Sequence, residues 1–455
     1  MKASSARIDL TRGPIIRRAL LFALPICIGN VLQQLYGTVD TLVVGNYCGP
    51  ESLAAVGTSS QPIEMFLCLF MGLGTGVSIL VSQHTGSGDS AHQRAVIANA
   101  NVFLYLCAIP LTILGFLFGP LLLRLMQVPE ESWSYAVDYI RILFLGTLGN
   151  LGYNVNAGIL RGVGDSRSTL LFLLISCVTN IVLDLLFVVS FGMDVAGVAL
   201  ATSIAMILSW VCSMVYIMRR YPELGYTPLP RGLDKAILKE IIRISLPLGL
   251  NQSIYSVGHF VVQALINGQG FVFAAACSVG GKVNGMANVA IQSMASAATA
   301  FAGQNLGAKR YDRLYRGGWR IPFFTGALTC AAGLVVTIFC APILRLFNDD
   351  PEVLVMAERF VRTVLPFCWT YAVFNSIIAF VNGMGLMKYA TIVNILVLWV
   401  VRIPVAFLIA TFWDGSWVMV CYSASFVVGM LAMLLFFLSK RWKEIRVLAR
   451  GMETA

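Results

Sequence analysis

Two acidic residues lie inside long apolar stretches of the sequence, where a charge is costly. Asp40 interrupts LQQLYGTVDTLVVGN, residues 32–46, and Asp184 interrupts CVTNIVLDLLFVV. An ionisable side chain at the centre of a membrane-spanning helix costs about 2.5–3.5 kcal/mol on insertion scales, so it usually faces a bundle interior or a water-filled cavity. A place at a helix end near lipid headgroups is the alternative for Asp40, but the apolar run continues through Val44. The two acids therefore indicate an ion-binding site.

Two neutral polar residues are expected at the same depth as the acids. Asn180 precedes Asp184 by four positions, a spacing that puts both on one helix face. Asp184 and Thr202 each lie about six residues from the turn that joins their two spans, and Asp40 lies about five residues from the end of its own span on the same side. Helical rise therefore puts the three residues at a similar depth. The pattern predicts that the four side chains lie in one layer.

This layer suits either of two ions. Carboxylate, amide and hydroxyl oxygens suit a hard cation such as Na⁺, by extension from Ca²⁺ and Mg²⁺. Alternatively, desolvation and a like charge close by would raise the pKa of a carboxylate toward the range where it can load and release protons. Asn180 or Thr202 alone could simply hydrogen-bond helices to one another, but the pair of aspartates predicts coupling to H⁺ or Na⁺. No organic cofactor and no other metal is expected.

The elements that must position these residues are membrane helices. Hydrophobic residues make up 58% of the 455 residues, charged residues make up 12%, and the mean hydropathy is +0.80, unlike a soluble domain. A spanning helix needs about 20 mainly apolar residues, whereas barrel strands alternate over about ten. The predicted fold class is an all-α polytopic membrane protein. Its twelve expected spans are 15–44, 52–83, 95–119, 133–158, 168–190, 196–218, 237–267, 270–303, 318–341, 354–381, 388–411 and 417–438.

The basic residues predict the topology. Lys and Arg accumulate on the cytoplasmic side of membrane proteins, and most of the 32 basic residues share one side when both termini are placed in the cytoplasm. We therefore expect a multi-pass inner-membrane protein. The net charge of +10 is interpreted as this topology signal and not as a nucleic-acid footprint. The eleven cysteines form no CxxC pair and are expected to pack within the spans.

The two halves of the chain repeat at an interval of 221 residues. SQHTGSG recurs as GQNLGAK, and a shared interval over several pairs indicates duplication. The repeated pairs are Gln83 and Gln304, Arg124 and Arg345, Arg141 and Arg362, Asn154 and Asn375, Gly162 and Gly383, and Gly164 and Gly385.

Duplication predicts the domain organisation. We expect an N-lobe (1–218), a cytoplasmic linker (219–236) and a C-lobe (237–455), related by a pseudo-two-fold axis along the membrane normal. The cleft between such lobes is the expected substrate site. The interval carries Asp184 to Val405, so ion coupling is expected in the N-lobe alone.

Five motifs together resemble the MATE family of multidrug and toxic compound extrusion transporters. They are LPICIGNVLQQLYGTVDTLVVGN, SLAAVGTSS, GLGTGVSILVSQHTGSGD, ILRGVGDSRSTL and AFAGQNLGAKRYD. The resemblance covers nearly the whole chain and is strongest to the prokaryotic DinF-like branch. It implies twelve helices in two lobes around a central cleft, and multidrug efflux of organic cations or amphiphilic compounds by antiport with H⁺ or Na⁺. It assigns the coupling ion to Asp40, Asn180, Asp184 and Thr202.

The resemblance adds further residues around this site. Gln33, Tyr36 and Asn154 are expected to line the substrate cavity. Pro25 removes a backbone hydrogen bond and is expected to allow a kink in the first helix, although Pro247 occupies the same place in the half without the acid. The implied partners are small molecules and membrane lipid, and we expect a monomer.

Other functions fit the sequence less well. No HExxH, Walker A or GxSxG motif occurs, so an enzyme is not expected. A flippase for lipid-linked saccharides or another anionic lipid stays open, because Lys282 and Arg402 lie within spans. A membrane protein that does not transport is the second alternative.

Two further predictions concern polar residues outside the ion site. Glu64 and Lys282 lie near equivalent positions of the two halves and are candidates for an ion pair, and His84 is expected in a short loop.

Overall fold

The computed structural model describes residues 7–125, 128, 130–229, 232–345, 347 and 350–453. Within these residues every regular element is a helix, which confirms the predicted fold class. Eight helical segments among them are long and apolar enough to cross a membrane. The other four of the twelve predicted spans correspond to α2 (Pro50–Ser87), α4 with α5 (Glu130–Leu145 and Thr147–Gly162), α8 (Lys235–Asn267) and α9 (Phe271–Gly307).

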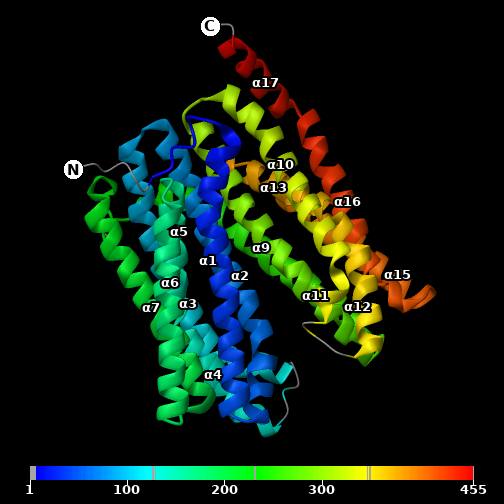
Figure 1. Cartoon of the computed structure of the whole chain (residues 1–455). Helices are drawn as coiled ribbons and strands as arrows, with labels where there is room; N and C mark the ends of the chain where they lie inside the picture. The colour runs from blue at the N-terminus through cyan, green and yellow to red at the C-terminus, as the bar shows by residue number, and fades with distance from the viewer. Residues whose placement is uncertain are drawn as a thin grey trace. The chain divides into compact units, whose positions relative to one another are not determined.

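The helices form two compact units. Unit 1 comprises Leu24–Ser253 together with Arg7 and Ile8, coloured blue to green in Figure 1. Within it α2 packs along α5, α7 packs against α4, α5 and α6, and α3 packs against α4. Its remaining elements are α1 (Ile15–Tyr47) from Leu24 onward, α3 (Ser90–Leu125), α6 (Ser166–Asp184), the π-helical turn η1 (Leu185–Ser190), α7 (Asp194–Arg220), the 3₁₀ turn η2 (Pro222–Leu224) and α8 as far as Ser253.

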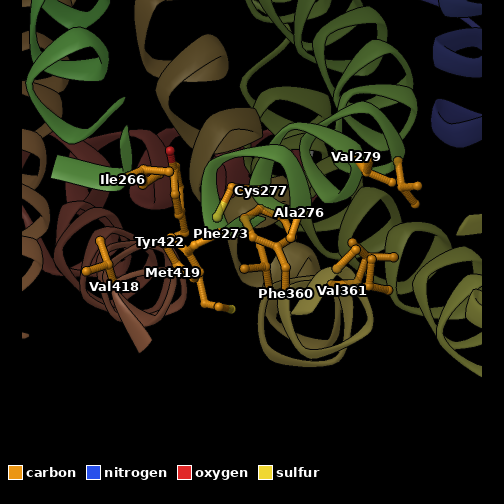
Figure 2. Packing of buried hydrophobic residues seen from close by; sticks show 14 of the residues in the cluster. Ile266, Phe273, Ala276, Cys277, Val279, Phe360, Val361, Val418, Met419 and Tyr422 are labelled. Atoms are coloured by element: carbon orange, nitrogen blue, oxygen red, sulfur yellow. The ribbon is translucent and has the colours of Figure 1, made fainter. Parts of the chain in front are cut away.

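Unit 2 comprises Asp9–Ala23 and the residues from Ile254 onward. Its helix α9 packs against α10, α12 and α13, and α13 packs against α16. Figure 2 shows part of its core, where Phe273, Phe360 and Tyr422 are buried together. Its other elements are α10 (Tyr311–Ile338), α11 (Cys340–Leu344), α12 (Pro351–Val364), η3 (Leu365–Phe367), α13 (Cys368–Gly383), α14 (Met387–Leu396), the π-helical η4 (Val397–Arg402), α15 (Ile403–Phe412), η5 (Gly415–Trp417), α16 (Val420–Leu434), η6 (Leu435–Leu438) and α17 (Lys440–Glu453).

The unit boundaries fall inside α1 and α8, so the units differ from the sequence halves 1–218 and 237–455 in two segments. The segment Asp9–Ala23 belongs to unit 2. Its Leu10 N–H donates to Gln304 Oε1 at 3.1 Å, and the Leu10 carbonyl accepts from Asn305 Nδ2 at 3.1 Å. The start of α8 joins unit 1 because its backbone lies against α2 at Gly72 and Gly76.

The duplication is visible in the backbone. Glycines with a positive φ angle precede α2 and α9: Gly49 (φ 90°) and Gly270 (φ 108°). A second pair, Gly164 (φ 93°) and Gly385 (φ 81°), follows the ends of α5 and α13. Glycine adopts this conformation without steric cost. Each pair keeps the interval of 221 residues, so the repeat extends from side chains to turn geometry.

Candidate functional site

Asp184 lies at the end of α6, where the helix changes type. Asp165 caps the start of α6, its carboxylate accepting from the N–H of Ser168 at 3.0 Å. The helix is α-helical through Asp184 and continues as the π turn η1. Single π turns inside α-helices occur frequently at functional sites. The Asp184 side chain is fully buried.

Three helices of unit 1 bring the predicted layer together. The Asp40 side chain, from α1, contacts the side chains of Asp184 and Asn180 from α6. Asn180 Nδ2 donates to Thr202 Oγ1, from α7, at 3.2 Å. The four residues that helical rise placed at one depth are therefore neighbours. Their role in ion coupling stays a prediction.

The oxygen atoms of this cluster lack donors. Oδ1 of Asp40, Oδ1 of Asn180 and both carboxylate oxygens of Asp184 are buried and accept no hydrogen bond from the residues that the structure describes. An ionised carboxylate only accepts hydrogen bonds, so contact between Asp40 and Asp184 cannot satisfy both groups. A buried charge without a partner is costly. A proton shared by the carboxyl groups, or a cation held among the oxygens, would remove this deficit.

A cavity of about 170 Å³ adjoins the cluster. It is smaller than the roughly 300–1,000 Å³ of drug-sized ligand sites, so it suits an ion and water and not a whole drug molecule. Asp40 contributes to its wall. The described residues that line it are Tyr36, Asp40, Ile63, Phe70, Tyr139, Leu143, Phe144, Gly146, Thr147, Asn150, Thr202, Ser203 and Met206.

The three residues predicted to line the substrate cavity are placed differently by the structure. Tyr36 lies in the cavity wall, whereas Gln33 and Asn154, both in the described part of the chain, are not among its lining residues. Gln33 is exposed beside Tyr36. Asn154 Nδ2 donates within α5 to the Asn150 carbonyl at 2.9 Å and to its Oδ1 at 3.0 Å. Pro25 lies inside α1, which continues on both sides of it, so the kink stays a prediction.

Sequence reasoning missed the polar residues contributed by α4 and α5. Tyr139, Thr147 and Asn150 line the cavity, but none carries a charge inside an apolar run, which was the signal that singled out Asp40 and Asp184. Asn150 offered one hint, because it precedes Asn154 by four and so shares its helix face.

Unit 2 buries a cation instead of an acid. Arg402, at the end of η4, is 2% exposed. Its Nε donates to Ser425 Oγ at 2.9 Å and its Nη1 donates to the Tyr255 hydroxyl at 2.8 Å. The guanidinium also lies over the rings of Tyr255, Tyr422 and Phe426, at 5.1–5.5 Å from their centroids. No carboxylate of the described residues pairs with it, and hydroxyl groups and aromatic faces surround the guanidinium.

The other charges within spans have separate surroundings. Lys282 is exposed and lies 5.8 Å from the ring of Phe347. The side chain of Glu64 is outside the described part of the structure, so the suggested Glu64–Lys282 pair stays a prediction.

A larger cavity of about 730 Å³ lies in unit 2 among α10, α16 and α17. Its lining includes aromatic residues such as Trp319 and the basic residues Lys443 and Arg446.

A comparison with known families matches the two halves of the chain separately. The family model described as MatE matches residues 25–186 and again residues 247–408. The chain belongs to the MATE family. Each half of this MATE protein thus carries one copy of the family's unit, as the interval of 221 residues predicted.

Relatives extend over nearly the whole chain. The probable multidrug resistance protein YoeA of Bacillus subtilis (strain 168) is 30% identical over 437 residues, which cover 92% of each protein. The probable multidrug resistance protein YpnP of the same organism is 26% identical over 443 residues, covering 96% of this chain and 98% of YpnP. A solved structure titled as the outward-facing conformation of a multidrug resistance MATE family transporter of the MOP superfamily is 25% identical, with a TM-score of 0.86 over 98% of this chain and 99% of that chain.

Proposed function

We propose that this MATE protein is a secondary active multidrug exporter, which moves organic cations or amphiphilic compounds outward by antiport with H⁺ or Na⁺. The observation that carries the proposal is the group of four buried acceptor oxygens on Asp40, Asn180 and Asp184 that have no donor among the described residues. The names of the relatives YoeA and YpnP support export of several drugs. Transport places the protein in the cell membrane as a multi-pass protein, and the basic loops favour cytoplasmic termini.

The two carboxyl groups couple ion and substrate through their charge. Two unit charges about 4 Å apart interact by about 4 kcal/mol at an effective dielectric constant of 20. When the ion leaves Asp40 and Asp184, this repulsion favours a hydrated, open arrangement of α1 and α6. When the ion binds, the pair closes. The free-energy difference between the two arrangements is of the size needed to shift a population strongly, since about 5.5 kcal/mol moves it from 1:99 to 99:1.

The test uses purified protein in proteoliposomes. A fluorescent lipophilic cation is followed while a pH gradient or a Na⁺ gradient is imposed separately. Movement driven by one gradient and lost in Asp40→Asn supports the proposal and identifies the ion. Asp138→Asn is the matched control, because Asp138 is an exposed acid of α4 outside the cluster. Equal transport by the wild type and Asp40→Asn would contradict the coupling role.

An anionic substrate is the second candidate, and Arg402 is the observation that favours it. A buried guanidinium that pairs with no carboxylate of the described residues suits a phosphate or carboxylate group, as in a lipid flippase of the same superfamily. The same liposomes, loaded with a fluorescent anionic phospholipid, distinguish the two. Lipid movement lost in Arg402→Gln, without cation movement in the wild type, would favour the flippase. Absence of both movements would favour a protein that does not transport.

A further inference from the structure

Two of the chain's three histidines lie together at one end of unit 1, outside the coupling site. His84 is in the last turn of α2, His92 is in the first turn of α3, and Glu240 is in the second turn of α8. One ligand atom of each lies within 4.8 Å of the others, and all three residues are half-buried. His84 was expected in a loop, but α2 continues past it to Ser87.

The turn between α2 and α3 holds the two imidazoles. The N–H of His92 donates to Asp89 Oδ1 at 3.0 Å, which caps the start of α3. Gln93 Nε2 donates to Thr85 Oγ1 at 2.7 Å and so ties the two helix ends together. The rings of His84 and His92 lie with their centroids 4.3 Å apart. Their relative placement is therefore fixed by the turn and not by flexible side chains alone.

Close contact between α2 and α8 holds the carboxylate. Gly72 lies against the backbone of Gly249, and Gly76 lies against Ser245, so closely at both places that a Cβ on the α2 glycine would clash. Glu240 is just over one turn before Ser245 on the same helix. This contact leaves its Oε2 3.5 Å from His92 Nε2. Three helix ends thus direct one carboxylate and two imidazoles at a common point.

The donor set has a defined metal preference. Two imidazole nitrogens and a carboxylate oxygen suit Zn²⁺ and related first-row divalent metals, whereas Ca²⁺ and Mg²⁺ prefer oxygen alone. Zn–N bonds of about 2.0–2.1 Å place two ligands of a tetrahedral site roughly 3.3 Å apart. The His92–Glu240 separation of 3.5 Å already has this size.

We propose that His84, His92 and Glu240 bind a divalent transition metal, Zn²⁺ or one of similar chemistry, with water as the fourth ligand. The metal links α8 to the α2–α3 turn and stabilises unit 1. The site is independent of the proposed ion coupling, since it shares no residue with the Asp40–Asp184 cluster. The competing interpretation is an ordinary His92–Glu240 ion pair beside a second imidazole.

The test titrates Zn²⁺ into tag-free, chelator-treated full-length protein by calorimetry. We expect one Zn²⁺ per chain and a rise in the melting temperature with Zn²⁺. Losing even an outer-shell partner typically weakens metal affinity 10–100-fold, so His84→Ala, His92→Ala and Glu240→Gln should each weaken binding about tenfold or more. His259→Ala is the matched control, because His259 belongs to unit 2.

Two results would overturn the proposal. The first is Zn²⁺ affinity that is unchanged in the His84→Ala/His92→Ala protein. The second comes from X-ray absorption at the zinc edge of the wild type, which needs no variant to fold. A shell of nitrogen and oxygen supports the site, and a shell of sulfur assigns the metal to some of the eleven cysteines.

Discussion

The carboxyl groups of Asp40 in α1 and Asp184 in α6 meet inside unit 1, although nothing among the described residues donates a hydrogen bond to either carboxylate oxygen of Asp184. Such a contact is unfavourable for two ionised groups, because each removes solvent from the other without providing a proton. A protein that needed only stability would have an apolar pair here. The contact is consistent with a site that is completed by the transported ion.

Replacing Asp184 should separate function from stability. Asp184→Asn removes one charge and adds an amide donor for Asp40, so we expect gradient-driven transport to fall by tenfold or more while the free energy of unfolding rises by about 1 kcal/mol. Transport in proteoliposomes and thermal melting in detergent measure the two effects. A variant that melts well below the wild type would show that the carboxylate is structural.

Thr202→Val should distinguish Na⁺ from H⁺ as the coupling ion. The substitution keeps the shape of the side chain and removes the hydroxyl that accepts from Asn180 at 3.2 Å. If the oxygens hold Na⁺, losing one ligand should raise the Na⁺ concentration for half-maximal transport by about tenfold. If a proton is shared by the two carboxyl groups, the pH dependence should stay close to that of the wild type. Ser203→Ala is the control for altered packing in the same wall of the cavity.

The grouping of the four polar residues could be predicted from sequence because depth along a membrane helix is proportional to residue number. That argument needs only helix ends and the rise per residue, and it placed Asp40, Asn180, Asp184 and Thr202 together. The duplication could also be predicted from sequence, since the same residues recur at one interval.

The walls of the cavity could not be predicted in this way. The sequence suggested one span over 133–158, whereas the structure divides it at Gly146 into α4 and α5. No proline marks the break, which depends on the approach of Gly146 to Ser203 of α7. The π turn after Asp184 likewise has no composition signal. The His92–Glu240 contact depends on the packing of the start of α8 in unit 1, and the order of the elements along the chain does not predict this packing.

The contact between α2 and α5 should be sensitive to a single methyl group. A Cβ at Gly158 would clash with the carbonyl oxygen of Gly74, and overpacking of this kind typically costs about 1–3 kcal/mol. We therefore expect Gly158→Ala to lower the melting temperature. Gly37→Ala is the control, because no atom lies within 4 Å of its added Cβ; glycine to alanine inside a helix should there be neutral or stabilising by up to about 1 kcal/mol. Equal melting of the two variants would contradict the close packing.

A buried carboxylate with full hydrogen bonding offers the contrast to Asp184. Asp165 Oδ2 accepts from the hydroxyls of Ser168 and Tyr221, each at 2.7 Å, and from Tyr216 at 3.3 Å. Asp165→Ala removes the α6 cap and leaves these donors unpaired, so we expect a loss of about 2–4 kcal/mol. Tyr221→Phe removes one donor and should cost about 1 kcal/mol. Thermal melting of both variants at neutral pH shows whether Asp165→Ala is the more destabilising of the two. An Asp165→Ala protein as stable as the wild type would contradict the structural role of this carboxylate.

The ionisation of Tyr221 should make the free energy of unfolding depend on pH in the alkaline range. Burial, and then the adjacent Asp165, raise the pKa of Tyr221, which lies just after α7. The folded state therefore holds the phenol proton more tightly than the unfolded state, whose tyrosine titrates near pH 10. The contribution of Tyr221 is complete below about pH 10 and is lost as the pH rises further, because the unfolded state gains by ionising first. The stability difference between the wild type and Tyr221→Phe should accordingly be constant from pH 7 to 9 and shrink at pH 11. A difference that stays constant through pH 11 would show that folding does not raise the pKa of Tyr221.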